Sequence, residues 1–548
     1  MTSDANKKHA HKLVFEARSL LQQVDSLAQV QEAAEEAVRL LDQAIQFDSN
    51  NVEAWNGRGI VKAMFGNYEE AIADFSQAIE FASGDSSFWK NRATAKLKIG
   101  DNQGALEDFT QAIKLESRDP YTWENRGVAK GELSDFDGAV TDFSRAIDLD
   151  PENLSAWYNR GLAKVELNDF RGAVVDFSQA IEFDSKDARI WHNRGIAKAE
   201  SDDHYGAIAD FGTAIDLEPE EVAFWNDRAV SKIKLGDFKG AIADFLKADK
   251  LNPNDALILS NLGGAKSEIG DHRGAIADCT RVIEIDANNL IALNNRGIAK
   301  GELGDYEGAI IDFSRAIEID QGDIDGWNNR GIAKSKFGKH KEAIADFSQV
   351  IKIDSKNLSA WVNRSVAKGK AGDYDGAIAD STRAIEINRN NIYSWNNRGV
   401  AKTAIGDFYG AIADLTQAID LGPDEASIWH SMAMAKFGIG QIEDAIGDLK
   451  KALELAPQNK QIQHSIKHIQ SAKLTRADQE QQTKSLTQST VRSSSMKYQT
   501  PEWFNRVFGN YEFQSNSYTI QHKKYPNRKI GLRIISAIVR LAMWSSLF

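Results

Sequence analysis

A single cysteine, Cys279, occurs among the 548 residues of the chain. One cysteine cannot form an intramolecular disulfide or a cysteine-based zinc site, and this scarcity is typical of proteins from a reducing compartment. Residues 1–12 also lack an apolar stretch of the length that a signal peptide requires. Together these two absences predict a cytoplasmic protein.

The sequence also lacks an excess of basic residues. Its formal net charge is -13 and its pI is about 5.4. Because a protein needs a basic face to bind phosphate groups, this charge argues against nucleic acid as a partner and favours other proteins. With 42% hydrophobic and 26% charged residues, most of the chain is expected to fold.

No recognisable catalytic motif is present. The chain has no phosphate-binding glycine loop, dinucleotide fingerprint or serine elbow. His464 and His468 have a spacing that can bind a metal, but no third ligand accompanies them. Cys279 stands where most repeats have an aromatic residue, which predicts a small buried hydrophobe rather than a nucleophile. We therefore predict a protein that is not an enzyme, with no metal site and no cofactor.

What the sequence does contain is a period of 34 residues. Tryptophan marks it at Trp55, Trp89, Trp123, Trp157, Trp191, Trp225, Trp327, Trp361, Trp395 and Trp429, and Leu259 and Leu293 hold the two remaining places. The series predicts twelve repeats over residues 52–459, with tryptophan at position 4 of each repeat.

Each repeat divides into two predicted helices. Positions 4, 7, 8 and 11 lie along one stripe of a first helix, which we call helix A. Position 15 is glycine in nine repeats and serine, asparagine or aspartate in the others, which predicts a turn with a left-handed residue. Position 20, in a second helix that we call helix B, is alanine in all twelve repeats. Alanine there lets the two helices pack closely.

This unit, with Trp, Gly, Ala, Phe, Ala and an occasional Pro at these spacings, resembles the tetratricopeptide repeat. The resemblance implies an all-α fold, a right-handed superhelical solenoid of antiparallel helix pairs. It also implies a non-enzymatic scaffold or adaptor that binds extended segments of one or more proteins in a concave groove.

Charged residues recur in the same way along the array. Position 7 is arginine in ten repeats, position 11 is lysine in all twelve, and position 23 is aspartate in all twelve. Because both signs repeat together, we predict a ladder of ion pairs between helix A and helix B. Two alternatives are solvated surface charges and contacts with a charged ligand.

Position 6 supplies the candidate partner-binding residues, which are Asn91, Asn125, Asn159, Asn193, Asn261, Asn295, Asn329, Asn363 and Asn397. An amide can donate and accept hydrogen bonds, so a row of amides could hold an extended peptide by its backbone. The resemblance supports this role, because related superhelices present similar asparagines on the concave face. The alternative is that these amides only bond neighbouring helices.

Position 13 carries charges whose sign changes along the array. The residues are Glu132, Glu166, Glu200, Lys234, Glu268, Glu302, Lys336 and Lys370. The pattern suggests a partner whose basic residues meet repeats three to eight and whose acidic residues meet repeats nine and ten. The alternative is a solvated helix face.

The ends of the chain differ from the repeats. Within the N-terminal helices, residues 1–51, we expect a degenerate repeat at 18–51, with Leu21 at the tryptophan position and Ala37, Leu41 and Ala44 in helix B. We expect a capping helix at 460–473. A flexible linker is predicted at 474–500, followed by a basic, aromatic tail at 501–548.

Residues 530–548 form a predicted basic amphipathic helix. Three alternatives are open for this helix: an anchor on a membrane surface, docking on a partner or in the solenoid groove, and a poorly ordered terminus. Arg533 and Arg540 disfavour a spanning helix, since each costs roughly 2.5–3.5 kcal/mol near the bilayer centre. The second function hypothesis is therefore a peripheral membrane-associated assembly factor.

Overall fold

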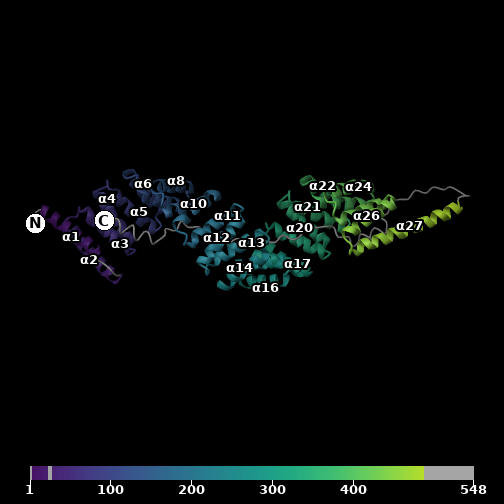
Figure 1. Cartoon of the computed structure of the whole chain (residues 1–548), viewed down its shortest axis with the longest axis horizontal. Helices are drawn as coiled ribbons and strands as arrows, with labels where there is room; N and C mark the ends of the chain where they lie inside the picture. The colour runs from purple at the N-terminus through teal and green to yellow at the C-terminus, as the bar shows by residue number, and fades with distance from the viewer. Residues whose placement is uncertain (1–2, 23–26, 487–548) are drawn as a thin grey trace. The chain divides into compact units, whose positions relative to one another are not determined.

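The computed structural model describes residues 3–22 and 27–486, and this part of the chain is built from helices without strands. The helices group into two compact units, of which the first ends at Pro253 and the second begins at Asn254. Figure 1 shows the helices following one another as pairs within each unit. This arrangement confirms the predicted all-α fold of antiparallel helix pairs.

The first unit contains α1 to α14. Their bounds are α1 Ser3–Gln22, α2 Leu27–Phe47, α3 Val52–Met64, α4 Tyr68–Phe81, α5 Ser86–Lys98, α6 Asn102–Leu115, α7 Pro120–Glu132, α8 Phe136–Leu149, α9 Leu154–Glu166, α10 Phe170–Phe183, α11 Ala188–Glu200, α12 His204–Leu217, α13 Val222–Lys234 and α14 Phe238–Leu251. From α3 to α26, odd-numbered helices are helix A and even-numbered helices are helix B of the predicted repeats.

The second unit contains α15 to α27. Their bounds are α15 Ala256–Glu268, α16 His272–Ile285, α17 Leu290–Glu302, α18 Tyr306–Ile319, α19 Ile324–Lys336, α20 His340–Ile353, α21 Leu358–Lys370, α22 Tyr374–Ile387, α23 Ile392–Ala404, α24 Phe408–Leu421, α25 Ala426–Gly438, α26 Ile442–Leu455 and α27 Lys460–Leu486.

Local sequence explains where these helices begin and end. Asparagine or aspartate at position 34 accepts a hydrogen bond from the backbone at the start of most A helices, as Asn357 does from the Ala360 amide. Position 15 has a positive φ in all twelve repeats, at nine glycines and at Ser134, Asn168 and Asp202. The predicted left-handed turn between helix A and helix B is therefore confirmed.

Small residues bring the two helices of a pair together. The alanines at position 20 are all 0 or 1% exposed. In repeat nine, a Cβ atom added to Gly331 would lie 2.7 Å from the ring of Phe347, so the glycine allows the aromatic ring to reach the backbone of helix A. This packing repeats through both units and buries one phenylalanine, or a smaller substitute, in each repeat.

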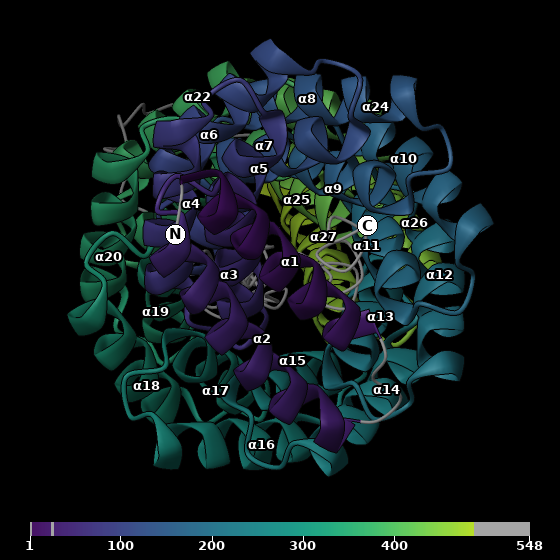
Figure 2. The ribbon, with the colours of Figure 1, turned by 90° about the vertical axis from the view of Figure 1, so that its left-hand side faces the viewer.

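Within the first unit, the two kinds of helix lie on opposite sides of a curve. Figure 2 shows α5, α7, α9, α11 and α13 on its inner side and α6, α8, α10, α12 and α14 on its outer side. A helices of consecutive repeats contact each other, as α7 contacts both α5 and α9. The inner face of this unit is therefore made of A helices.

Both predicted ends need correction. Ala37, Leu41 and Ala44 are buried in α2 as expected, but Leu21 lies at the end of α1 rather than near the start of a helix A. The reason is an apolar stripe that includes Ala10 and extends the helix upstream.

At the other end, Ile462 and Ile469 pack on the last repeat as a cap should. The predicted boundary at residue 473 is wrong, because α27 continues to Leu486. Residues 474–486 contain good helix formers and no glycine or proline, so part of the expected linker is helical. The rest of the linker and the tail, including residues 530–548, lie outside the described residues.

Among the helices of residues 3–22 and 27–486, none combines the length and the apolar character that a membrane crossing requires.

Candidate functional site: the inner face of the helix pairs

Ion pairs join helix A to helix B inside the repeats. In repeat nine, Arg330 Nε lies 3.0 Å from Asp346 Oδ2 and Arg330 Nη2 lies 2.9 Å from Oδ1, while Lys334 Nζ lies 2.8 Å from Oδ2. The Asp346 side chain is 4% exposed. The same triad recurs in every repeat that has the arginine, so the predicted ladder is confirmed.

The repeats without this arginine keep a reduced pair. In repeat seven, Leu262 replaces the arginine, and Lys266 Nζ lies 2.5 Å from Asp278 Oδ2. In repeat twelve, Lys436 lies 2.7 Å from Asp448. The pKa of Asp448 is raised: burial is the main cause, and the hydrogen bond and the charge of Lys436 oppose it.

In ten repeats, tryptophan connects the repeat to the loop before it, a role that was not predicted from the sequence. The Trp327 indole N–H donates to the carbonyl of Gln321 at 3.0 Å, and the guanidinium of Arg330 lies 4.6 Å from the centre of the indole ring. The hydrogen bond is present at all ten tryptophans of the repeats. Arginine three residues after tryptophan was the signal that could have revealed the stacking.

The nine asparagines at position 6 do not form an exposed row. Eight of them are 0 to 9% exposed, and Asn91 alone is half-buried. Asn91 Nδ2 donates to Asn56 Oδ1 at 3.0 Å, and Asn363 Nδ2 donates to Asn328 Oδ1 at 3.2 Å. Each bond joins position 5 of one repeat to position 6 of the next, so these amides connect neighbouring A helices.

The other asparagines follow this arrangement with different partners. Asn193 donates to the Tyr158 hydroxyl, Asn295 to the Ser260 carbonyl, and Asn125 to the Tyr121 carbonyl of its own helix; Asn261, Asn329 and Asn159 are equally buried. Asn397 Oδ1 and Nδ2 have no hydrogen-bond partner in the described part of the chain. The cause is Val362 at position 5 of the preceding repeat. Contact between these asparagines and a bound peptide remains a prediction.

A second set of contacts joins position 5 to position 34 across the inner face. Lys90 Nζ lies 2.9 Å from Asp119 Oδ2, and Asn294 Nδ2 donates to Asp323 Oδ2 at 2.8 Å. His192, which is also at position 5, instead contacts position 6 of the next repeat: its Nε2 lies 2.8 Å from Asp227 Oδ2. We call these contacts, together with those of position 6, the A–A seam. The side chains of the A–A seam differ from repeat to repeat. This variation can be recognised in the sequence only once position 5 is known to face the next repeat.

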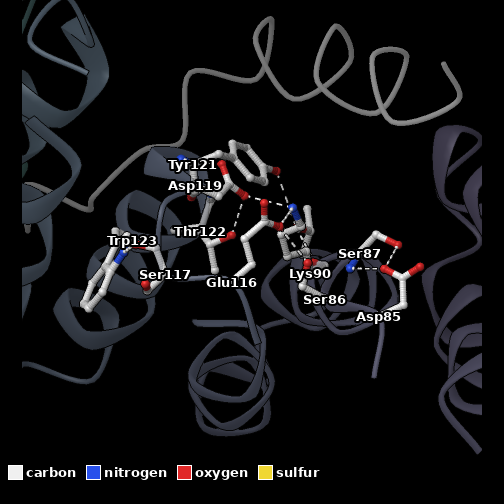
Figure 3. Close-up of polar contacts among 12 residues, drawn as sticks. Asp85, Ser86, Ser87, Lys90, Glu116, Ser117, Asp119, Tyr121, Thr122 and Trp123 are labelled. Carbon is white, nitrogen blue, oxygen red and sulfur yellow. Dashed lines mark hydrogen bonds and ion pairs between the residues drawn. The ribbon is translucent and has the colours of Figure 1, made fainter. Parts of the chain in front are cut away.

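Figure 3 shows the seam between repeats two and three, where Lys90, Glu116 and Asp119 point toward one another. Lys90 Nζ lies 3.6 Å from Glu116 Oε2, and the Ser86 hydroxyl donates to the same oxygen at 2.8 Å. Burial raises the pKa of Tyr121 to about 12. The tyrosine therefore stays neutral while the carboxylates beside it hold the lysine.

The next seam contact contains a carboxyl group that titrates near neutrality. Asn153 Nδ2 donates to Glu124 Oε2 at 2.9 Å. The pKa of Glu124 is raised to about 7: burial is the main cause, the hydrogen bond from Asn153 opposes it, and the charges of Asp150 and Asp119 add to it.

The charged residues of position 13 are exposed, in contrast to the seam. Glu132, Glu166 and Glu200 are the last residues of α7, α9 and α11, and Glu268, Glu302, Lys234, Lys336 and Lys370 end the A helices of their own repeats. Lys336 Nζ lies 4.0 Å from Glu302 Oε1. Three consecutive inner helices of the first unit thus end in exposed carboxylates.

Residues that could support chemistry are few. Where side chains are described, no group of three or more His, Cys, Asp or Glu residues is placed to hold a metal ion. Cys279 is fully buried, and burial raises the pKa of its thiol to about 12, so the thiol is not a nucleophile at neutral pH. The ring of His468, on the cap helix α27, lies 6.3 Å from the ring of Phe437 on α25.

Comparisons with known proteins agree with this geometry. Family models described as TPR repeat or tetratricopeptide repeat match residues 131–167, 21–86, 192–256, 154–187, 290–323, 324–357, 358–391 and 426–459. Together these matches cover more than half of the chain, and the last five coincide with units predicted from the tryptophan spacing. No curated protein matches the chain.

Solved structures with similar folds include three that differ in length. The APC/C hetero-tetramer Cut9-Hcn1 is 15% identical, with a TM-score of 0.39, and the match covers 86% of this chain and 96% of that one. Yeast Tom70 is 18% identical, with a TM-score of 0.37 and coverage of 78% and 97%. MamA from Desulfovibrio magneticus RS-1 is 24% identical, with a TM-score of 0.30 and coverage of 31% and 96%.

Proposed function

The chain belongs to the tetratricopeptide repeat family, and we propose that it is a non-enzymatic scaffold that binds extended protein segments along the inner face of its A helices. Members of this family serve protein–protein interaction. The more specific part of the proposal concerns the surface on which this chain binds a partner and the charge of the partner segment that it selects.

The observation that carries the proposal is the row formed by Glu132, Glu166 and Glu200. The C-terminal end of a helix is the negative end of its dipole, so a glutamate there costs about 0.3–1 kcal/mol relative to a neutral residue. This cost recurs at the ends of three consecutive inner helices. A bound segment with basic side chains would offset it.

The position 13 charges of the second unit extend the proposal. Glu268 and Glu302 would meet further basic residues, and Lys336 and Lys370 would meet acidic ones. The ladder carboxylates do not compete for such a segment, since arginine and lysine already occupy them. Selectivity is therefore expected to come from the ends of the A helices and from the A–A seam.

The test is an affinity capture from the source lysate with Glu132, Glu166 and Glu200 changed to lysine. We expect loss of the specific partners that the unchanged chain retains. The matched control changes three exposed glutamates of outer helices, Glu69, Glu107 and Glu182, to lysine. Retention of the same partners by the inner-face variant would contradict the proposal.

The asparagine hypothesis requires a separate experiment, because buried amides also support the fold. Asn91 is the member that a ligand could reach without rearrangement of the seam. If the amides hold a peptide backbone, Asn91→Ala should weaken partner binding while leaving the melting temperature close to that of the unchanged chain. Unchanged affinity would remove position 6 from the binding surface.

Membrane association through residues 530–548 remains the second prediction, and it depends on sequence alone. Co-sedimentation of the full chain with anionic vesicles, compared with a chain ending at Thr500, tests it. Equal recovery of the two chains in the vesicle pellet would contradict it.

A further inference from the structure

Two tyrosines stand out on the outer helices. Tyr205 on α12 is 77% exposed and Tyr409 on α24 is 76% exposed, more than any other large hydrophobic side chain that the structure describes. Both occupy position 18, the second residue of helix B. The other ten repeats have a charged or amide residue there. Packing within the repeat therefore does not account for either tyrosine.

The helices on either side of each tyrosine carry opposite charges at the same position. Tyr205 lies between α10 and α14, which present Arg171 and Lys239. Tyr409 lies between α22 and α26, which present Asp375 and Glu443. All four charged side chains are exposed, and α10, α12, α14, α22 and α24 lie on the outer side of their own unit's curve (Figure 2).

Neighbouring residues keep only part of this difference in charge. The aspartates of position 16 recur on both surfaces, whereas the exposed Asp202, three residues before Tyr205, reduces the positive charge beside it. One turn further along these helices, position 22 is Ala209, Ala243, Ala379, Ala413 or Gly447, except on α10, where Val175 is 59% exposed. Small residues beside the tyrosine keep it accessible. Lys473 of α27 pairs with Glu443 and reduces the negative charge at one flank, while Asp375 keeps it at the other.

We propose that these two surfaces bind each other between copies of this chain. The basic surface, Arg171, Val175, Tyr205 and Lys239 of one copy, would meet the acidic surface, Asp375, Tyr409 and Glu443 of a second copy. Both surfaces use one repeat position on three consecutive B helices, so their charges flank the central tyrosine in the same geometry. Tyrosine would pack against tyrosine, and each cation would face a carboxylate.

This contact is heterologous, because each copy uses a different surface from its neighbour. Such a contact generates open assemblies or rings rather than a closed two-fold dimer. Its charges are exposed and screened by salt, so association should be weak and should decline as ionic strength rises. The proposal uses outer helices and does not depend on the inner face binding a partner.

Sedimentation velocity of the full chain tests the proposal over a concentration series at low and high salt. We expect the weight-average sedimentation coefficient to rise with concentration at low salt. At high salt it should fall toward the value of the monomer. Arg171→Glu with Lys239→Glu should weaken self-association at least tenfold, and so should Asp375→Lys with Glu443→Lys. An unchanged chain that stays monomeric throughout would overturn the proposal.

A mixture of the two double variants separates this contact from a general effect of charge. One variant has two acidic surfaces and the other has two basic ones, so neither should associate alone and their mixture should. The control, Glu69→Lys with Glu307→Lys, changes position 18 on helices away from the tyrosines and should associate like the unchanged chain. Melting curves verify that each variant is folded. A mixture that stays monomeric would contradict the pairing.

Discussion

The ladder between helix A and helix B and the seam between consecutive A helices lie a few residues apart, yet they differ in how they vary. Arginine, lysine and aspartate recur in the ladder with nearly the same distances in ten repeats. Along the seam, position 5 is by turns Lys90, Glu124, Tyr158, His192 and Val362. The ladder is a constant set of contacts that joins helix A to helix B. The seam is a variable set of contacts that distinguishes one repeat from another.

Repeat seven shows which parts of the constant set the fold can lose. Leu259, Leu262 and Cys279 replace the tryptophan, the arginine and the phenylalanine, and all three are 0 or 1% exposed. Apolar volume therefore substitutes for the stacked arginine, while the lysine–aspartate pair stays. The comparison teaches that the buried aspartate needs a cation, whereas the aromatic parts are replaceable.

The largest expected effect is at the aspartate of the ladder. Asp346→Ala leaves Arg330 and Lys334 partly buried without their carboxylate, and should lower the local stability of repeat nine by about 3–5 kcal/mol. Hydrogen exchange of the α19 and α20 amides measures this loss. The exposed control Glu342→Ala should change exchange little, and equal protection in the two variants would mean that the ladder is not structural.

The next effect is at the tryptophan. Trp327→Leu imitates repeats seven and eight and should cost about 2–3 kcal/mol, since it removes a hydrogen bond, a stacked arginine and part of the buried side-chain volume. In a background of Arg330→Leu the same change should cost less, by about 0.5–1 kcal/mol. Additive losses in this double-mutant cycle would show that the two side chains are independent.

A smaller, pH-dependent effect is expected at the seam. The pKa of Glu124 is raised to about 7 in the folded chain, from an ordinary value of 4.5. Its contribution to stability is thus fully present below pH 4.5 and is lost as pH rises through 7. Glu124→Gln should match the unchanged chain near pH 4.5 and exceed it by roughly 3 kcal/mol at pH 8. A pH-independent difference in melting would contradict this assignment.

The smallest effects distinguish two asparagines of the same column. Asn363→Ala removes a hydrogen bond to Asn328 and should cost about 1 kcal/mol. Asn397→Leu removes an amide without a partner beside Val362 and should be close to neutral or stabilising. Thermal melting of the two variants compares them, and a larger loss at Asn397 would show that its amide has a bound partner in solution.

Much of the constant set could be predicted from the sequence. Because the period is strict, the same position can be compared in all twelve repeats. The left-handed turn, the packing alanine and the ion pairs could all be predicted from this comparison. The face occupied by position 6 could not be predicted this way. An amide at a fixed position suits either a groove or a seam, and only the approach of the next A helix, 35 residues along, buries Asn363 against Asn328.

The helix boundaries at the two ends of the chain could not be predicted, for a related reason. Outside the period there is no register, so Leu21 was assigned by counting back from helix B. Because α2 begins at Leu27 and is longer than the B helices of the repeats, that count does not reach the start of a helix A. The end of α27 depends on helix propensity alone, because the repeat pattern stops before it.

The central claim is that a partner lies along the inner helices of the first unit, and site-specific crosslinking tests it most directly. A photoreactive amino acid would replace Glu166 at the end of α9, and in a second variant Glu182 on the outer helix α10 of the same repeat. The account predicts a partner crosslink from position 166 and none from position 182. A crosslink from position 182 alone would place the partner on the outer face and contradict the account.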